Sequence, residues 1–295
     1  RAALKAVDPI EAVFRYVKLV DGALQVGERR FDFKDYDRIL VVGAGKAGAP
    51  MARALEDLLG DRISDGVIVV KEGHGLPLQH VRTHEAGHPV PDERGIRGAE
   101  DILSLVSAAG ERDLVLCVIS GGGSALLVAP AEGVTLEDKQ EVTRLLLACG
   151  ADIHDINTVR KHLSRAKGGW LARCAHPSTF ADARGVFKKF GIWERVPSSV
   201  RGRIQLGLKG DIQDTPKSGD VAFQRCYAEL VGTNILALIA AGKEAERQGY
   251  RALILSSTVE GEAREVVKVL TAIAKEVRSS GNPFPPPACI LWGGE

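Results

Sequence analysis

The chain has 295 residues, of which 45% are hydrophobic and 26% charged, and its formal net charge is +1. This composition is that of a folded globular protein and excludes the disordered, collagen-like and coiled-coil classes. Because the net charge is close to zero, no strong field of one sign directs the chain to nucleic acid or a membrane surface, and neither is expected as a partner. A chain of this length usually forms two domains.

No segment looks like a targeting or membrane element. The longest uncharged run, 114–131, contains three consecutive glycines and a proline, which a bilayer helix would not contain. No secretory signal precedes the first strand, so the cytoplasm is the expected location. The five cysteines form no CxxC pair and are expected to be small buried hydrophobes. Both ends, Arg1 and Glu295, look cut.

The first half of the chain alternates between apolar runs of strand length and runs with helical periodicity. Strands are predicted at 39–42, 67–70, 81–85 and 114–119, with helices at 47–59 and 93–108. Such alternation indicates parallel βα units in an α/β fold with a doubly wound parallel sheet.

The second half begins with a helical region and then returns to βα alternation. A helix capped by Thr135 with Asp138 three residues on is predicted to end near Gly150. The other predicted elements are helices at 156–173, 181–190 and 198–208, a strand at 229–232, a helix at 234–248, a strand at 252–256, a helix at 260–279 and a strand at 288–292. We therefore expect a Rossmann-like domain over 38–228 and a second α/β domain formed by 1–37 and 229–295.

The first candidate site is the GAGKAG turn, which follows a predicted buried strand and opens a helix. Gly43 and Gly45 would let the backbone approach an anion, free N–H groups at the helix start would bind it, and Lys46 adds a full positive charge. The same letters match the dinucleotide fingerprint GxGxxG. In that reading the next strand should end in an acidic residue, but it ends in Lys71, and Glu72 comes one position late. Phosphate or carboxylate binding and dinucleotide binding both remain open from this motif.

A second glycine-rich loop follows the last strand of the predicted sheet. It consists of Ser120, Gly121, Gly122, Gly123 and Ser124. Ligands of open α/β sheets bind at the carboxyl ends of the strands, and the hydroxyl and amide groups of such a loop could hold a polyphosphate. A purely structural turn explains three consecutive glycines less well, because they lose conformational entropy without adding packing.

A third candidate is a basic helix face. Asn157, Arg160, Lys161 and Ser164 are spaced i, i+3, i+4 and i+7, so they share one face of the predicted helix. Such a face is often no more than solvated surface.

Two loops have weaker signals. His88 lies between Gly87 and Pro89, where a histidine more often serves loop conformation than catalysis. Glu260 lies between a predicted strand and a helix, where it could bind a ligand or simply favour the helix dipole.

Taken together, these motifs resemble the type II glycerate kinases. The resemblance extends over nearly the whole chain and is carried by VVGAGKAG at 41–48, EAGHPVPDE at 85–93, ISGGGSALL at 119–127, INTVRKHLSRAKGG at 156–169, VGTNILAL at 231–238, SSTVEGEARE at 256–265 and ILWGGE at 290–295.

The resemblance implies a kinase that transfers the γ-phosphate of ATP to D-glycerate, with phosphorylation of the 2-hydroxyl favoured. It also implies a divalent cation, by chemical default Mg²⁺, and a ligand cleft between two α/β domains. Lys46 matches the family's catalytic lysine, and the Ser120–Ser124 loop, Asn157, Arg160, Lys161 and Glu260 are expected to contact ATP or glycerate. A homodimer is possible.

The sequence departs from the family at two places. The strand and Asp-containing loop expected after 171–173 are absent, and the glycine-rich segment with a catalytic arginine expected after Glu295 has no counterpart. We expect both to reflect segments left out of this sequence. The main alternative is an NAD(P)-dependent hydroxypyruvate reductase, for which GAGKAG would be a dinucleotide turn. A catalytically inactive sugar-acid or nucleotide sensor is a third reading.

Overall fold

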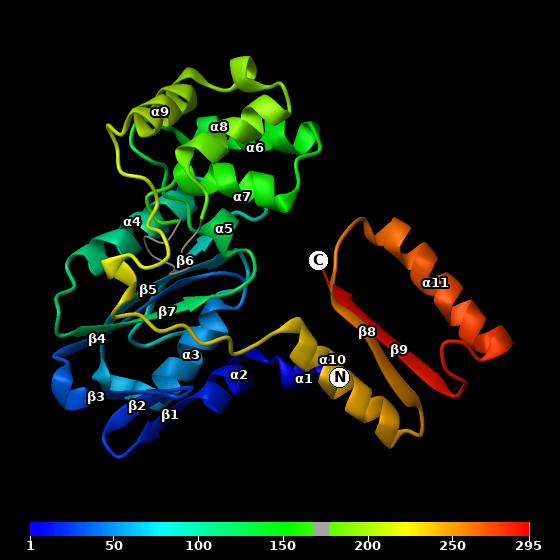
Figure 1. The fold of residues 1–295 in the computed structure, drawn as a ribbon. Coiled ribbons are helices and arrows are strands. Elements are labelled where there is room, and N and C mark those ends of the chain that lie inside the picture. The colour runs from blue at the N-terminus through cyan, green and yellow to red at the C-terminus, as the bar shows by residue number, and fades with distance from the viewer. Residues whose placement is uncertain (168–176, 295) are drawn as a thin grey trace. The chain divides into compact units, whose positions relative to one another are not determined.

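The computed structural model describes residues 1–167 and 177–294 (Figure 1). The contacts between Cα atoms divide the chain into two units. Unit 1 comprises Arg1–Lys18, Gln25–Glu28 and Glu229–Glu295, and unit 2 comprises Leu19–Leu24 and Arg29–Ala228. The two units are described separately below.

Unit 2 contains a four-stranded parallel sheet with the strand order β6-β5-β4-β7. Its strands are β4 (Arg38–Ala44), β5 (Ile63–Lys71), β6 (Arg82–Ala86) and β7 (Asp113–Ile119). The four strands predicted in this region are therefore confirmed, and so is the α/β class. The central strand β4 is almost entirely buried, as expected for a parallel sheet with both faces covered.

Helices cover both faces of this sheet. They are α3 (Gly48–Leu59) and α4 (Glu93–Ser107), both close to their predicted bounds. Gly48 of α3 faces Val70, whereas Gly98 of α4 faces Val69. Because successive side chains of a strand point to opposite faces, α3 and α4 lie on opposite sides of the sheet.

The strand order reverses beside β4. The chain moves from β4 outward through β5 to β6, and then returns to place β7 on the other side of β4. In sheets of this kind, ligands bind at the carboxyl ends of the strands beside such a reversal, which here are β4 and β7. The two glycine-rich loops predicted as candidate sites follow these two strands, and the second continues into the short helix α5 (Gly123–Leu126).

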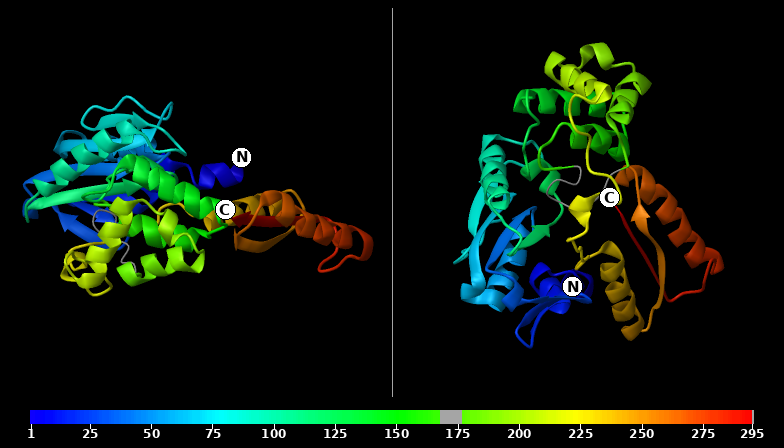
Figure 2. Two further views of the ribbon diagram at one scale, coloured as in Figure 1. Left: turned by 90° about the horizontal axis from the view of Figure 1, so that it is seen from above. Right: turned by 60° about the vertical axis from the view of Figure 1, so that its left-hand side comes forward.

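A cluster of helices forms the rest of unit 2 (Figures 1 and 2). It consists of α6 (Leu136–Ala148), α7 (Ile153–His162), α8 (Phe180–Lys189) and α9 (Ser198–Lys209). Their apolar faces share one core, in which Leu146, Phe187 and Ile204 are fully buried. The Thr135 cap is confirmed as a capping box, since the Thr135 hydroxyl accepts from the Asp138 N–H and the Asp138 carboxylate from the Thr135 N–H.

The helix predicted at 156–173 is wrong in its length. α7 ends at His162, and residues 168–173 of the prediction lie outside the described residues. After the helix, Ala131 N–H donates to Leu163 O and Arg165 N–H donates to Ala129 O. Because these backbone groups bond with residues 129–131, the chain leaves the helix and Ser164 forms a β-bridge with Pro130. Ser164 therefore does not belong to the predicted helix face.

Unit 1 contains a two-stranded parallel sheet of β8 (Arg251–Val259) and β9 (Ala288–Gly294). Its helices are α1 (Ala2–Ala6), α2 (Pro9–Tyr16), α10 (Asn234–Arg247) and α11 (Ala263–Ser280). α10 packs against both strands, and α1 packs against α10. The strand predicted at 229–232 is wrong: this segment is irregular, and among the described residues it pairs with no strand.

A three-stranded sheet near the N-terminus was not predicted. It has the order β1-β2-β3, with β1 (Val17–Val20), β2 (Ala23–Val26) and β3 (Arg29–Asp32). Asp21 and Gly22 connect the first two strands with φ values of 45° and 74°. Positive φ at both central residues is typical of the two-residue hairpin turn that Asp-Gly favours.

Candidate active site

The loops after β4 and β7 are joined by hydrogen bonds. Ser120 N–H donates to Ala44 O at 3.1 Å, Lys46 N–H donates to Gly121 O at 2.9 Å, and Ala47 N–H donates to Ser120 Oγ at 2.9 Å. The structure therefore brings Lys46 and the Ser120–Ser124 loop together at the carboxyl edge of the sheet, which is the edge where ligands of such sheets bind.

Gly43 and Gly45 are required for this close approach. A Cβ atom on Gly43 would lie 2.2 Å from Val118 O, and one on Gly45 would lie 2.2 Å from Ser120 Oγ. Gly45 also has a φ of +137°, which side chains other than hydrogen rarely allow. The structure thus gives both glycines a packing role. Their contact with a ligand stays a prediction.

The N–H groups of residues 45–48 in the first loop are not free, whereas Ala49 N–H, in the first turn of α3, has no acceptor among the described residues. Besides the two bonds from Lys46 and Ala47, Gly45 N–H donates to Val69 O at 3.0 Å and Gly48 N–H donates to Gly45 O at 3.1 Å. In this turn the charge available to an anion is therefore the Lys46 ammonium rather than the backbone.

The second loop has the free N–H groups that the first one lacks. Within residues 1–167 and 177–294, the N–H groups of Gly121, Gly122 and Ser124 have no hydrogen-bond acceptor. Gly122 has a φ of +87°, and the position that its Cβ would occupy is 3.2 Å from Lys46 Cγ. An anion held by these N–H groups would therefore lie beside the Lys46 side chain.

Three further basic side chains lie around Lys46. His88 follows β6, and its Nε2 is 3.0 Å from the position of a Cβ on Gly122. Burial and the charges of Lys46 and Lys71 lower the pKa of His88, and His74 adds to this effect. His74 Nδ1 lies 3.3 Å from Lys46 O.

Lys71 and His74 were missed as site residues. Lys71 ends a predicted strand beside the strand that leads to Lys46, so strand adjacency was the signal that could have located it.

A second group of cations lies on the far side of Ser124. Arg160 Nη2 donates to Ser124 O at 3.4 Å, Lys167 Nζ donates to the same oxygen, and Lys139 Nζ donates to Leu163 O at 3.1 Å. In the part of the chain that the structure describes, none of these three side chains has a carboxylate partner. We call Lys139, Arg160 and Lys167 the buried cation cluster after Lys139, which is buried, whereas Arg160 and Lys167 are half-buried.

The pKa values of this cluster reflect burial and mutual repulsion. Burial, with the nearby charge of Arg160, lowers the pKa of Lys139 to about 7. Burial and the charges of Lys139 and Arg160 lower the pKa of Lys167 well below its ordinary value, and burial lowers that of Arg160. Because unpaired cations repel one another at low dielectric, an anionic ligand would stabilise all three.

The other predicted residues are more dispersed. Asn157 and Lys161 lie on α7 with Arg160. Lys161 lines a pocket of about 260 Å³ together with His162, Arg203 and Thr215, none of which is a predicted site residue. Glu260 follows β8 and belongs to unit 1.

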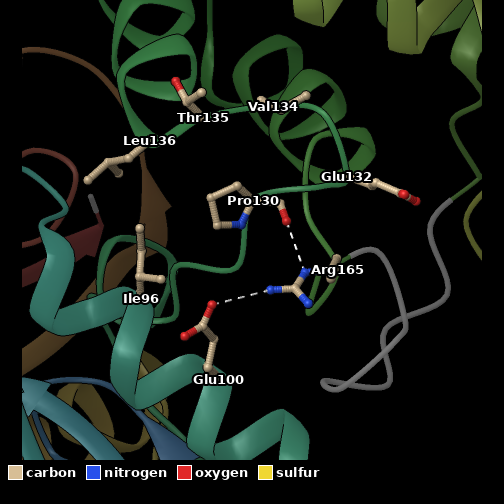
Figure 3. Close-up of a pocket in the computed structure, with 8 residues that line it drawn as sticks. All are labelled: Ile96, Glu100, Pro130, Glu132, Val134, Thr135, Leu136 and Arg165. Carbon is tan, nitrogen blue, oxygen red and sulfur yellow. Dashed lines mark hydrogen bonds and ion pairs between the residues drawn. The ribbon is translucent and has the colours of Figure 1, made fainter.

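A larger pocket of about 440 Å³ contains none of the predicted residues (Figure 3). Its polar side chains include Arg165, Glu100 and Glu132, and apolar residues complete it. Arg165 lies 3.8 Å from the Glu100 carboxylate and donates to Pro130 O at 3.0 Å. Because its one cation already pairs with a carboxylate and a second acid lies nearby, this pocket is poorly suited to a phosphate.

The described parts of the chain contain no group of side chains that would form a metal site by itself. There, no three histidine, cysteine, aspartate or glutamate side chains are grouped so that they could hold a metal ion. No helix of these parts is long and apolar enough to span a membrane.

The fold and the site thus define an α/β protein whose glycine-rich loops and surrounding cations suit an anionic ligand. Comparison with known proteins gives consistent results. A family model described as a domain of unknown function, DUF4147, matches residues 1–179. A glycerate 2-kinase of Pyrococcus horikoshii is 40% identical over 320 residues, which cover 99% of this chain and 71% of the relative.

Two further proteins extend the comparison. An Agrobacterium vitis protein, provisionally named a hydroxypyruvate reductase, is 41% identical, and the match covers 88% of this chain and 63% of the relative. A crystal structure of a Pyrococcus horikoshii protein matches this chain with a TM-score of 0.83 and 40% sequence identity. The match covers 100% of this chain and 72% of the chain in that crystal structure. The chain belongs to the type II glycerate kinase family. It spans about two thirds of the length of the two relatives.

Proposed function

We propose that the protein is a glycerate kinase that transfers the γ-phosphate of ATP to D-glycerate and forms 2-phosphoglycerate. The observation that carries this proposal is the position of Lys46. It stands where the two glycine-rich loops meet, in a chain 40% identical to a glycerate 2-kinase.

The chemistry fits what the described residues offer. In phosphoryl transfer the protein mainly positions the reactants and neutralises charge on the transferring group. The Lys46 ammonium and the N–H groups of Gly121, Gly122 and Ser124 would bind the oxygens of that group. The buried cation cluster, two of whose members, Arg160 and Lys167, contact the Ser124 carbonyl, would bind further anionic oxygens of ATP or the glycerate carboxylate.

The remaining expectations stay with this proposal. Residues 38–228 would form a Rossmann-like domain, and 1–37 with 229–295 a second α/β domain that contributes Glu260. Asn157 and Lys161 would also contact a substrate. The enzyme would act in the cytoplasm, either as a single chain or as a homodimer.

Magnesium would enter with ATP rather than bind to a protein cage. Mg²⁺ usually keeps several waters and takes only one or two carboxylates besides the substrate phosphates. The described residues offer no cluster of three ligands, and we assign no residue to the metal.

The proposal is tested by measuring ADP release from ATP and D-glycerate in the presence of magnesium, with identification of the phosphorylated product. Lys46→Ala is expected to lower kcat by about 10²–10³-fold, the usual effect of removing one preorganised charge stabiliser. Lys209→Ala, at the exposed end of α9, is the matched control and should keep full activity. Equal activity of both variants would contradict the role of Lys46, and absence of ADP release from the unmodified chain would contradict the kinase itself.

A reductase is the second candidate because one relative is named for that reaction. A dinucleotide site would need an acidic residue at the end of β5 to grip the ribose. The strand ends in Lys71, and the Glu72 carboxylate lies 3.0 Å from Arg94 Nη2 in an ion pair. Oxidation of NADH or NADPH by hydroxypyruvate, without ADP release in the first assay, would favour the reductase.

A further inference from the structure

The proposed kinase reaction releases a proton, and none of the residues given a role in the proposed function accepts it. When the hydroxyl oxygen of glycerate attacks the γ-phosphorus, its O–H bond must break. Lys46 and the buried cation cluster supply positive charge, whereas a base has to take this proton. The following inference rests on the proposed function and concerns that base.

His88 lies beside Gly122 and the Lys46 side chain in the candidate site. Its Nε2 and the Lys46 side chain both lie about 3 Å from the position that a Cβ on Gly122 would occupy. A side chain at Gly122 would therefore meet the imidazole and the lysine together. The imidazole, the Lys46 side chain and the Ser120–Ser124 loop are therefore neighbours.

The loop that carries His88 is held in place by Asp92. The Asp92 carboxylate accepts from Gly87 N–H at 3.1 Å and from Gly95 N–H at 3.1 Å, where it caps α4. The residue before His88 is thereby tied to the start of a helix. This anchoring holds the backbone next to His88 in place, as a functional side chain requires.

The surroundings of His88 favour the neutral imidazole, which is the form that can accept a proton. Basic groups face it from two neighbouring elements: Lys46 after β4, and Lys71 and His74 at and after the end of β5. With burial, they lower the pKa of His88, so that it is neutral at pH 7.

The acidic groups nearby do not offset this effect, because each has its own partners. Asp92 pairs with Arg94 in addition to the two N–H groups, and Glu72 pairs with the same arginine. Glu85 accepts from the N–H groups of Gly73 and Gly75. The Ser120–Gly123 segment on the β7 side contributes no ionisable side chain.

We propose that His88 is the general base of the reaction and that its Nε2 accepts the proton of the reacting glycerate hydroxyl. The O–H bond breaks as the new O–P bond forms, and the bond between the γ-phosphorus and the bridging oxygen breaks to release ADP. The proton on His88 then passes to water. Lys46 and Lys71 oppose a lasting imidazolium, so the base is restored after each turnover.

The test compares the pH dependence of kcat for the full chain and for His88→Gln. The unmodified enzyme should lose activity at acidic pH as the imidazole becomes protonated, at a pH below the ordinary histidine pKa of about 6.5. His88→Gln should lower kcat by about 10²–10⁴-fold, leave the KM for ATP nearly unchanged and remove this acidic limb. His80→Gln, which changes an imidazole whose neighbour is the exposed Asp61, is the control and should behave like the unmodified enzyme.

Two other readouts separate this proposal from a folding defect and from failure of the kinase proposal. The thermal unfolding midpoint of His88→Gln should match that of the unmodified chain. An NMR titration of the imidazoles should give His88 a pKa below its ordinary value, which rises in Lys46→Met, whether or not the enzyme turns over.

An unchanged kcat and pH profile in His88→Gln, beside an active unmodified enzyme, would overturn the proposal. The proposal would also be overturned if His74→Gln, rather than His88→Gln, removed the acidic limb of the pH profile.

Discussion

Replacement of Gly45 by alanine tests the most constrained point of the candidate site. Gly45 has a φ of +137°, and an added Cβ would lie 2.2 Å from Ser120 Oγ and 2.7 Å from Ser120 O. The methyl group must therefore displace Ser120 or change the backbone. Displacement of Ser120 breaks the hydrogen bond from Ala47 N–H to Ser120 Oγ.

The expected loss of stability follows from these two effects. A non-glycine residue held in such a sparsely populated conformation costs about 1–3 kcal/mol. A lost hydrogen bond adds about 0.5–1.5 kcal/mol. Together they predict that Gly45→Ala lowers the free energy of unfolding by about 2–4 kcal/mol, a fall in Tm on the order of 10 °C for a unit of this size.

The matched control is Gly210→Ala. Gly210 also has a positive φ, 81°, but nothing lies within 4 Å of its Cβ position. It should therefore lose only the backbone contribution, about 1–2 kcal/mol. The free energy of unfolding of both variants is measured by urea unfolding followed by circular dichroism. Kinase activity should fall only in Gly45→Ala. If Gly45→Ala were no less stable than Gly210→Ala, the inferred contact between the two loops would be refuted.

Two further predictions concern α9 and the buried cation cluster. A Cβ on Gly207 would lie 2.2 Å from the Phe180 ring, whereas Gly202 in the same helix has nothing within 4 Å. Gly207→Ala should lower the free energy of unfolding, measured in urea, by about 1–3 kcal/mol. Gly202→Ala should raise it by up to about 1 kcal/mol. Equal changes in the two variants would contradict the packing of Gly207 against Phe180. The pKa of Lys139 is about 7 in the folded chain and near 10.4 in the unfolded chain. The cost of burying its charge therefore lowers the free energy of unfolding by its full amount below pH 7, and this cost disappears above the unfolded pKa. Lys139→Met should therefore raise the free energy of unfolding at about pH 6 and lower it at about pH 10, where the bond to Leu163 O is the main loss. A difference that did not vary with pH would exclude the buried charge as its cause.

Local sequence rules located elements whose causes are also local. The helix starting after Thr135 is an example, because the residues that cap it lie three positions apart. The strands of the parallel sheet were equally accessible, since burial on both faces leaves continuous apolar runs such as 39–42.

The errors arose where partners distant in the chain decide the structure. Helical periodicity continues beyond His162, but the backbone of Leu163 and Arg165 bonds to residues 129–131 instead. The segment 229–232 has strand composition, yet a strand requires a pairing partner that composition cannot supply. The turn at Asp21 and Gly22 was a local signal that could have predicted the first hairpin.

The candidate site was predictable in its position but not in its chemistry. The two glycine-rich loops were recognised because each follows a buried strand. Which loop keeps its N–H groups free was not visible, since it depends on Ser120 and Gly121 accepting bonds from the loop of Lys46. The grouping of His88 with Lys71 likewise depends on the strand order, which brings β4, β5 and β6 together.

The division of the chain has a consequence for synthesis. Unit 1 combines Arg1–Lys18 with Glu229–Glu295, whereas all of unit 2 lies between these two segments. On the ribosome, α1 emerges long before α10, the helix against which it packs. Domains generally fold as units during translation, so unit 2 can fold while α1 still waits for its partner. α1 is therefore made long before α10 and forms its contacts with that helix late in synthesis.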